Sequence, residues 1–326
     1  MRRSLRLLAV SCLALAALAL AAGPAGASPA AARAGSGLHA VDLNGHTYLV
    51  QTHGRFGVKP IRATAAPAAG GTLSVQTNGR RGVVSPTPTV YLVFWGNQWS
   101  NDPAGAEPAL QAFFTGLFGS VDTWGTIMNQ YCEGVPAGTK TCGTHGIHIA
   151  HPTATPLAGV WMDNAARAPG NATQAQIAAE AVAAAQHFGN TTQTSNLNSQ
   201  YVIASAHGTH PDGFPNTGFC AWHDFTSSSF GNLAYTNLPY VADLGTGACT
   251  TIAGGNLLDG YFSTETHEYA ESNTDLWPAR GWLGAGGEVA DECIQLDSYL
   301  TLSTGTFDVQ GLWSNDRNKC ATHEAA

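Results

Sequence analysis

The stretch from Ser263 to Ser272 carries residue types that bind metal ions, spaced by one helical turn. His267 and Glu271 are four residues apart, and Glu268 lies beside them. Residues at i and i+4 share a helix face, so this imidazole and carboxylate can reach a common point. A His-Glu-x-x-His helix binds zinc in this way, and here Glu replaces the second His. The sequence therefore predicts a metal-binding helix.

A catalytic zinc ion takes three protein ligands and keeps a further position for water. Glu288 follows two glycines and lies 17 residues after Glu271, and we predict it as the third ligand. Asp291 shares a face of the same turn, and we expect it to accept a hydrogen bond from the other nitrogen of His267. Glu268 is then the general base for a water molecule that the metal activates.

The predicted ligand set determines which ion is expected. Two carboxylates and one imidazole form a harder set than two imidazoles and one carboxylate, so Mn²⁺ or Ca²⁺ can compete with Zn²⁺. We expect Zn²⁺. The alternatives are a structural or non-zinc metal site and the absence of any metal.

Two further histidines, His207 and His210, follow a predicted buried strand. Loops at strand ends gather functional groups, so either residue could stabilise an oxyanion or supply a metal ligand. The competing interpretation is a turn rich in Gly and Pro whose histidines are solvated. His223, which follows Cys220, is considered only as a substrate contact.

The metal-binding helix is expected from about residue 256 to 273, because Pro278 prevents it from continuing much further. Leu258, Tyr261, Phe262 and Tyr269 fall on the face opposite His267. This apolar arc would pack on the core and leave the ligand face open toward solvent.

The preceding elements alternate between strands and helices, which predicts an α/β layered domain. After residue 212 the chain is richer in glycine and loops, so we expect the C-terminal part to be loop-rich and stapled by disulfides. Upstream, the expected strands are 89–95, 157–161 and 201–206, and the expected helices are 108–121 and 173–188.

The N-terminus has a basic start, an apolar run and a small-x-small pattern at Ala25–Ala27, which predicts a secretory signal over 1–27. Residues 28–85 form either a pro-segment, with Arg80-Arg81 as a dibasic cleavage site for a processing protease, or a flexible linker. Residues 86–326 are expected to form a single metallohydrolase-like domain.

The charge balance bears on possible partners. Without the signal, 11 basic residues face 22 acidic ones, a net charge of about −11. So acidic a chain does not attract nucleic-acid phosphates, and we expect no nucleic-acid partner and no membrane binding after signal cleavage. We expect a secreted, extracellular monomer that meets a peptide or protein substrate.

Six cysteines follow the predicted signal, and an even number in a secreted chain implies disulfides. The local pairing is Cys132 with Cys142. Taking the remaining cysteines in sequence order gives Cys220–Cys249 and Cys293–Cys320, one of several possible connectivities.

The His267 helix and the Glu288-x-x-Asp291 turn resemble the gluzincin metallopeptidases, in which the second helix ligand is His and the downstream motif is one residue longer. Three stretches also resemble bacterial secreted relatives of the plant phosphate-induced, EXORDIUM-like extracellular proteins. They are Val90–Gly96, Gly218–His223 and Leu257–Cys293. The resemblance implies a zincin-like active-site helix in an extracellular protein.

The sequence thus favours a secreted zinc endopeptidase. The alternative is a non-catalytic extracellular or cell-wall-associated binding protein with a structural metal site. No Gly-x-Ser-x-Gly elbow is present, and a glycosidase that uses Glu268 with Glu288 would leave His267 unexplained.

Overall fold

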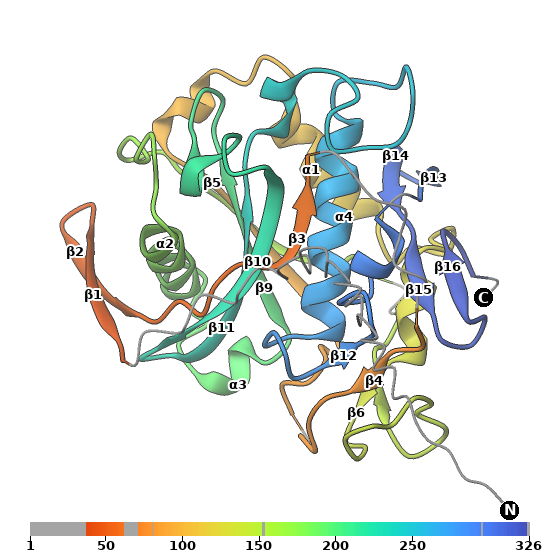
Figure 1. The fold of residues 1–326 in the computed structure, drawn as a ribbon. Coiled ribbons are helices and arrows are strands. Elements are labelled where there is room, and N and C mark those ends of the chain that lie inside the picture. The colour runs from red at the N-terminus through yellow and green to blue at the C-terminus, as the bar shows by residue number, and fades with distance from the viewer. Residues whose placement is uncertain (1–36, 62–70, 80, 152–153, 295, 325–326) are drawn as a thin grey trace, which may run out of the picture. The chain divides into compact units, whose positions relative to one another are not determined.

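A mixed six-stranded sheet, in the order β3-β10-β11-β9-β5-β8, organises the structure, which is a computed structural model (Figure 1). The neighbours β8, β5, β9 and β11 are parallel, whereas β10 is antiparallel to both β11 and β3. The strands are β3 (Phe56–Pro60), β5 (Thr89–Trp95), β8 (Leu157–Asp163), β9 (Ser199–Ser205), β10 (Phe219–Ser228) and β11 (Gly231–Leu238).

The structure describes residues 37–61, 71–79, 81–151, 154–294 and 296–324. All of them fall within one packing unit. The predicted signal peptide and Arg80 lie outside the described residues. Among the described helices, none has the length and apolar character needed to cross a membrane.

Strand β5 shows why the sheet has helices on both faces. Its side chains alternate in direction, as in any strand. Leu92 and Phe94 belong to one hydrophobic core, and Val93 and Trp95 belong to another. A strand that is apolar on both faces must be covered on both, which confirms the predicted α/β layering.

Helices α1 (Ala106–Gly116) and α4 (Asp259–Thr274) lie on one face of the sheet, and α2 (Gln174–His187) lies on the other (Figure 1). Phe113 of α1 packs against Phe262 of α4, with ring centroids 5.7 Å apart. Helix α2 begins with a capping box, in which Thr173 and Gln176 bond to each other's backbone. A short helix, α3 (Gln193–Asn196), precedes β9.

Five two-stranded sheets and five 3₁₀ turns complete the described part of the chain. The paired strands are β1 (His39–Leu43) with β2 (His46–Val50), β4 (Ser74–Val75) with β12 (Trp282–Leu283), β6 (Cys132–Glu133) with β7 (Ile147–His148), β13 (Asp297–Leu302) with β14 (Gly305–Gln310), and β15 (Leu312–Ser314) with β16 (Lys319–Ala321). The 3₁₀ turns are η1 (Asn97–Ser100), η2 (Gly125–Gln130), η3 (Pro211–Gly213), η4 (Val241–Leu244) and η5 (Asp291–Cys293).

All three expected disulfides are present: Cys132–Cys142, Cys220–Cys249 and Cys293–Cys320. Cys220–Cys249 and Cys293–Cys320 lie in the part of the chain after residue 212, whereas Cys132–Cys142 closes a short loop before it. This confirms the expected disulfide-stapled C-terminal part.

The helix predicted to bind a metal, α4, differs from expectation in one respect. All 16 residues of α4 are buried, including those of the polar face. The expectation of a ligand face open to solvent is therefore wrong. Strand β14 covers the helix on one side, and β3 and β10 cover it on another (Figure 1).

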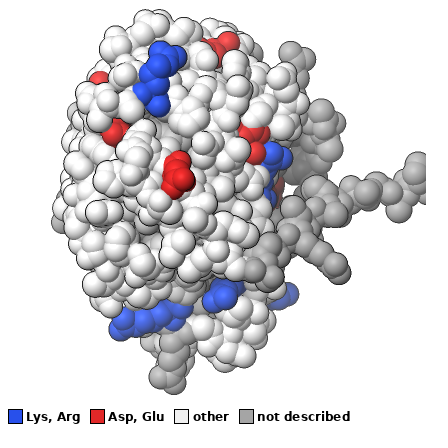
Figure 2. Space-filling model, turned by 90° about the vertical axis from the view of Figure 1, so that its left-hand side faces the viewer, with Lys and Arg blue, Asp and Glu red and all other residues white. Residues whose placement is uncertain are grey.

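Charged side chains are sparse on the face drawn in Figure 2. Outside the grey residues, basic groups lie along the lower edge and near the top of this view, acidic groups lie between them, and uncharged residues cover most of the face. This pattern agrees with the chain's charged fraction of 11%.

We expect Thr173→Ala to lower the free energy of unfolding by about 1 kcal/mol, because it removes the N-cap acceptor of α2. The Thr173 hydroxyl accepts from the Gln176 backbone N–H at 3.3 Å. Urea denaturation would measure the change. Thr173→Ser keeps the acceptor and should match the parent, and an equal loss in both variants would contradict this role.

Candidate metal centre

Two histidines and four acidic residues converge between α4, β10 and the turn around η5. Together they form the acidic–histidine cluster. All are almost fully buried except Asp291, whose side chain is 20% exposed. The members are His223, His267, Glu268, Glu271, Glu288 and Asp291.

Glu271 lies between the two imidazoles of the cluster. Its Oε2 is 3.2 Å from His267 Nε2 and 3.6 Å from His223 Nε2. His223 Nε2 is also 3.0 Å from Glu288 Oε2, and His267 Nε2 is 3.6 Å from Asp291 Oδ1. Ligand atoms around a tetrahedral zinc ion with bonds of about 2 Å lie roughly 3.3 Å apart. The spacing is therefore that of metal ligands.

Two groups of three residues each place one ligand atom apiece within 4.8 Å of one another. The first is His267, Glu271 and Asp291. The second is His223, Glu268 and Glu271. The predicted pair of His267 and Glu271 is thus brought together, and Glu271 belongs to both groups.

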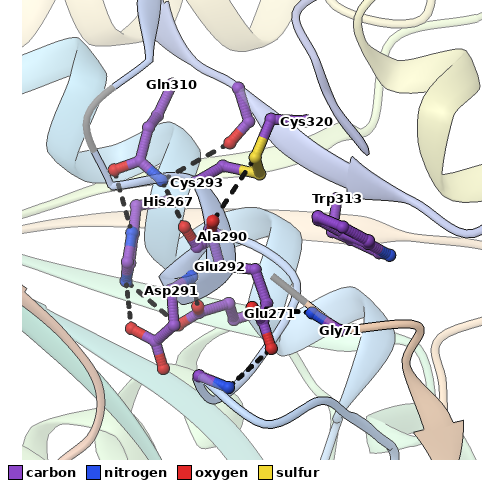
Figure 3. Close-up of a disulfide and its surroundings, with 12 residues drawn as sticks. Gly71, His267, Glu271, Ala290, Asp291, Glu292, Cys293, Gln310, Trp313 and Cys320 are labelled. Atoms are coloured by element: carbon purple, nitrogen blue, oxygen red, sulfur yellow. Dashed lines mark hydrogen bonds and ion pairs between the residues drawn. A yellow bond between two sulfur atoms is a disulfide. The ribbon is translucent and has the colours of Figure 1, made fainter. Parts of the chain in front are cut away.

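The tautomer of His267 is set by Gln310, which lies at the end of β14 (Figure 3). Gln310 donates from its amide nitrogen to the Ala290 carbonyl at 2.8 Å, which turns its Oε1 toward His267 Nδ1 at 3.1 Å. Because an amide oxygen only accepts, Nδ1 carries the proton. Nε2 is left with a free lone pair.

The lone pair of His267 Nε2 faces oxygen acceptors. Burial lowers the pKa of His267 to about 4, so the ring is neutral at pH 7. Besides the carboxylates of Glu271 and Asp291, the Gly57 carbonyl oxygen lies 3.1 Å from this nitrogen. A lone pair surrounded by acceptors is repelled unless a cation or a carboxyl proton lies between them.

Several carboxylate oxygens of the cluster likewise lack a hydrogen-bond donor in the described part of the chain. Burial, together with neighbouring carboxylates, raises the pKa of Glu268, Glu271 and Glu288 well above the usual range. Both oxygens of Glu268, Oε2 of Glu271 and Oε1 of Glu288 have no hydrogen-bond partner among the described residues. Buried carboxylates need a proton, a partner or a cation. Carboxylates and imidazoles together suit a divalent cation, so these residues fit the predicted metal.

Lys59 is a buried cation near these carboxylates, but its ammonium group bonds to residues outside the cluster. Its Nζ donates to the Ser263 hydroxyl at 2.6 Å, bonds to Gln310 and lies 3.6 Å from Asp297. Burial lowers the pKa of Lys59. One such ammonium group does not balance the carboxylates of the cluster.

Strand β3 closes the cluster on one side through Gly57. Gly57 has φ +50°, and a Cβ there would overlap Glu271 Oε2 and the His223 ring. Only glycine lets the backbone approach so closely. The ligand atoms are therefore covered by backbone from residues 56–60.

The structure changes two predicted roles. The other nitrogen of His267 bonds to Gln310, so the prediction that Asp291 accepts this hydrogen bond is wrong. Asp291 instead faces Nε2, and it is Asp291 rather than Glu288 whose oxygen lies in one group with His267 and Glu271. Glu288 still lies in the cluster, beside His223. The Asp291 backbone N–H donates to Glu271 Oε1 at 2.9 Å, which holds the start of η5 against α4.

The cluster does not include His207 or His210. His207 Nδ1 lies 2.5 Å from Asp243 Oδ1, and the exposed His210 donates its backbone N–H to Gly170 O. Neither belongs to a metal-capable group within the described ranges. Their oxyanion role stays a prediction, without support from the cluster's geometry.

Two residues of the site were not anticipated in these roles. His223 was expected only as a substrate contact, and Gln310 carries no sequence signal at all. For His223 a signal exists, since a His-Asp pair interrupts an otherwise apolar strand that begins at Phe219. A charged step in a buried strand indicates a polar partner on the adjoining element.

Comparison of the chain with protein-family models, with curated proteins and with solved structures gives no match. The resemblance to gluzincins and to EXORDIUM-like proteins therefore stays a prediction. The functional argument depends on the cluster itself.

We expect the chelator-treated protein to lose stability as the pH rises above about 6.5. The cluster's carboxyl groups keep protons in the folded state at pH values where unfolded Glu, with a pKa of about 4.3, has lost them. The stability that these protonated carboxyl groups contribute is complete below about pH 4.3, and it is lost as the pH rises through their raised folded pKa. His267 has the opposite effect and adds stability as the pH rises, but only between its folded pKa of about 4 and the unfolded value of about 6.5. Above about pH 6.5 the loss from the carboxyl groups is unopposed by His267. Urea unfolding at several pH values would measure the slope.

Zinc should reverse this loss, by about 2.7 kcal/mol at a concentration a hundredfold above Kd. Glu268→Gln should flatten the pH slope of the chelated protein, because it removes one buried carboxyl group. Asp316→Asn removes an exposed acidic group and should keep the parent slope. Equal slopes in the parent and Glu268→Gln, or no effect of zinc, would count against the cluster as a cation site.

Proposed function

We propose that this protein is a secreted metal-dependent hydrolase that cleaves peptide bonds. One observation carries the proposal: His267 Nε2 and Glu271 Oε2 lie 3.2 Å apart on one face of α4. The next residue after His267, Glu268, is fully buried, and neither of its oxygens has a partner among the described residues. Two ligands and an unpaired base on one helix are the components of a zincin-like active-site helix.

The proposed roles follow from the contacts. His267, Glu271 and Asp291 would hold the ion, with His223 and Glu288 beside them. When bound, such an ion polarises a carbonyl group and lowers the pKa of water. Zn²⁺ is the proposed ion, and the number of carboxylates keeps Mn²⁺ and Ca²⁺ as competitors.

Glu268 is proposed as the general base. A base needs a free oxygen and a pKa raised toward neutrality. Burial raises the pKa of Glu268, with Glu271 and Glu265 adding to the effect. Gln310 supports the same chemistry, because it keeps the His267 proton on Nδ1 and Nε2 free.

Strand β3 belongs to the region 28–85, for which a pro-segment and a flexible linker are the competing interpretations. The described residues of that region include paired strands, and Gly57 lies against the ligand atoms. These contacts favour the pro-segment. We propose that the site is latent while β3 is in place and that a peptide substrate enters when it leaves.

The burial of the cluster also favours a second candidate, the non-catalytic extracellular or cell-wall-associated binding protein with a structural metal site. Structural sites are closed, whereas catalytic ones keep an open position. The three disulfides suit an oxidising, extracellular setting for either candidate. An EXORDIUM-like relationship, a monomeric state and the lack of a nucleic-acid partner are part of both proposals.

Glu268→Gln should lower casein hydrolysis by about a hundredfold or more, the contribution of a general base. Metal analysis of the same sample should show the parent's metal content, since Glu268 lies outside the His267 group. His267→Ala should lose both metal and activity, and Asp316→Asn should lose neither. Full activity in Glu268→Gln excludes it as the base. Metal without proteolysis in the parent, even after the processing described next, supports the binding protein.

Cleavage at Arg80-Arg81 should increase the activity of the parent. Arg81 is exposed, so limited trypsin treatment can reach the dibasic step. Cutting converts the contact of β3 with the cluster from intramolecular to intermolecular, and dilution then favours release. Casein assays and intact mass before and after cutting would measure this. The control replaces both arginines by glutamine and should stay latent. Equal activity of cut and intact protein would refute latency.

A further inference from the structure

A cavity of about 700 Å³ lies at the carboxyl ends of β5, β8 and β9, apart from the residues of the acidic–histidine cluster. Residues after β5 form one wall, residues at the end of β8 form another, and His207 follows β9. The lining residues are Asn97, Gln98, Trp99, Ser100, Asn101, Met162, Asn164, Arg167 and His207.

The topology explains why a cavity forms at this edge. After β5 the chain leads to α1, which packs on the same face as α4. After β8 it leads to α2, whose residues belong to the core on the opposite face. The connections of these two neighbouring parallel strands therefore diverge (Figure 1). In α/β sheets, ligands bind in the crevice at such a point.

The walls of the cavity are held together by hydrogen bonds. The Gln98 amide donates to Ala168 O at 2.8 Å and accepts from Ala168 N at 3.0 Å. Asn97 N donates to Ala166 O at 2.8 Å. His207 is held by Asp243, which bonds to its Nδ1 and leaves Nε2 for a ligand. These bonds fix the walls of the cavity relative to one another, which lowers the ordering cost of binding.

Several polar groups in the lining have no partner among the described residues. The side chains of Asn97, Ser100, Asn101 and Asn164 are open to solvent and make no hydrogen bond to those residues, and the exposed Arg167 guanidinium has no acidic partner among them. Amides and hydroxyls both donate and accept, which matches the hydroxyl groups of a sugar. An unpaired guanidinium matches a carboxylate or a phosphate.

We infer that this cavity binds a small acidic carbohydrate, a hydroxyl-rich ligand with one carboxylate or phosphate group. A nucleotide base fits less well, because Trp99 is 5% exposed and its indole N–H is bonded to Ala204 O at 3.1 Å. No ring face of Trp99 is free for stacking. The inference does not depend on the metal or on hydrolysis.

Isothermal titration of the full chain with glucuronate, glucose 6-phosphate and glucose tests the proposal. We expect at least one acidic sugar to bind, and glucose to bind about tenfold more weakly or worse, since it lacks the charge-assisted contact. The acidic sugar that binds more tightly identifies the anionic group. Arg167→Gln should weaken its binding by about tenfold or more. Lys319→Gln, which removes an exposed charge elsewhere, should leave binding unchanged.

Other outcomes would overturn the inference. Absence of binding by both acidic sugars excludes the site, and equal binding in the parent and Arg167→Gln excludes the anionic contact. Acetate or inorganic phosphate binding as tightly as the sugar acids would make it a plain anion site. Binding should also survive chelator treatment, and loss of binding there would assign it to the metal cluster. A failed casein assay would leave these expectations intact.

Discussion

The burial of like charges around Glu271 is the constraint on which this structure depends. A carboxylate removed from water loses its hydration, and a second one beside it adds repulsion. Here Glu268, Glu271 and Glu288 share one buried region with two imidazoles, and several of their oxygens have no partner among the described residues. A cation between Glu271 and His267 would remove both costs at once. The same arrangement would then convert an unfavourable cluster into a binding site.

The elements around the cluster are tied to it by polar contacts rather than by apolar packing alone. Lys59 of β3 reaches Ser263 of α4 and Gln310 of β14, and Gln310 in turn orients His267. Gly57, on the same short strand, lies against Glu271 and His267. Strand β3 therefore acts as part of the site although it comes from the far N-terminal side of the sequence. This coupling is why latency and metal binding are proposed together.

The sheet gives the protein a second region where function can reside. The cluster is formed between β10, β3 and α4, where the sheet becomes antiparallel. The cavity lined by Arg167 lies at the carboxyl ends of the parallel strands. A parallel half with diverging connections and an antiparallel half covered by α4 thus provide two different environments, one open and polar and one buried and charged. The proposed carbohydrate site and the proposed metal site use these separately.

The sequence by itself determined the local features: the strand at 89–95, the Cys132–Cys142 disulfide and the pairing of His267 with Glu271. Each follows from spacing along the chain, because strand alternation, helix periodicity and short cysteine loops act over few residues. Only the tertiary structure decided that His223 and Gln310 lie at the cluster, that Asp291 rather than Glu288 lies beside His267, and that α4 is wholly buried. These depend on which strands cover α4, and contacts such as Gly57 with His267 span 210 residues. No local pattern specifies a contact at that separation, because it arises from the packing of the whole sheet.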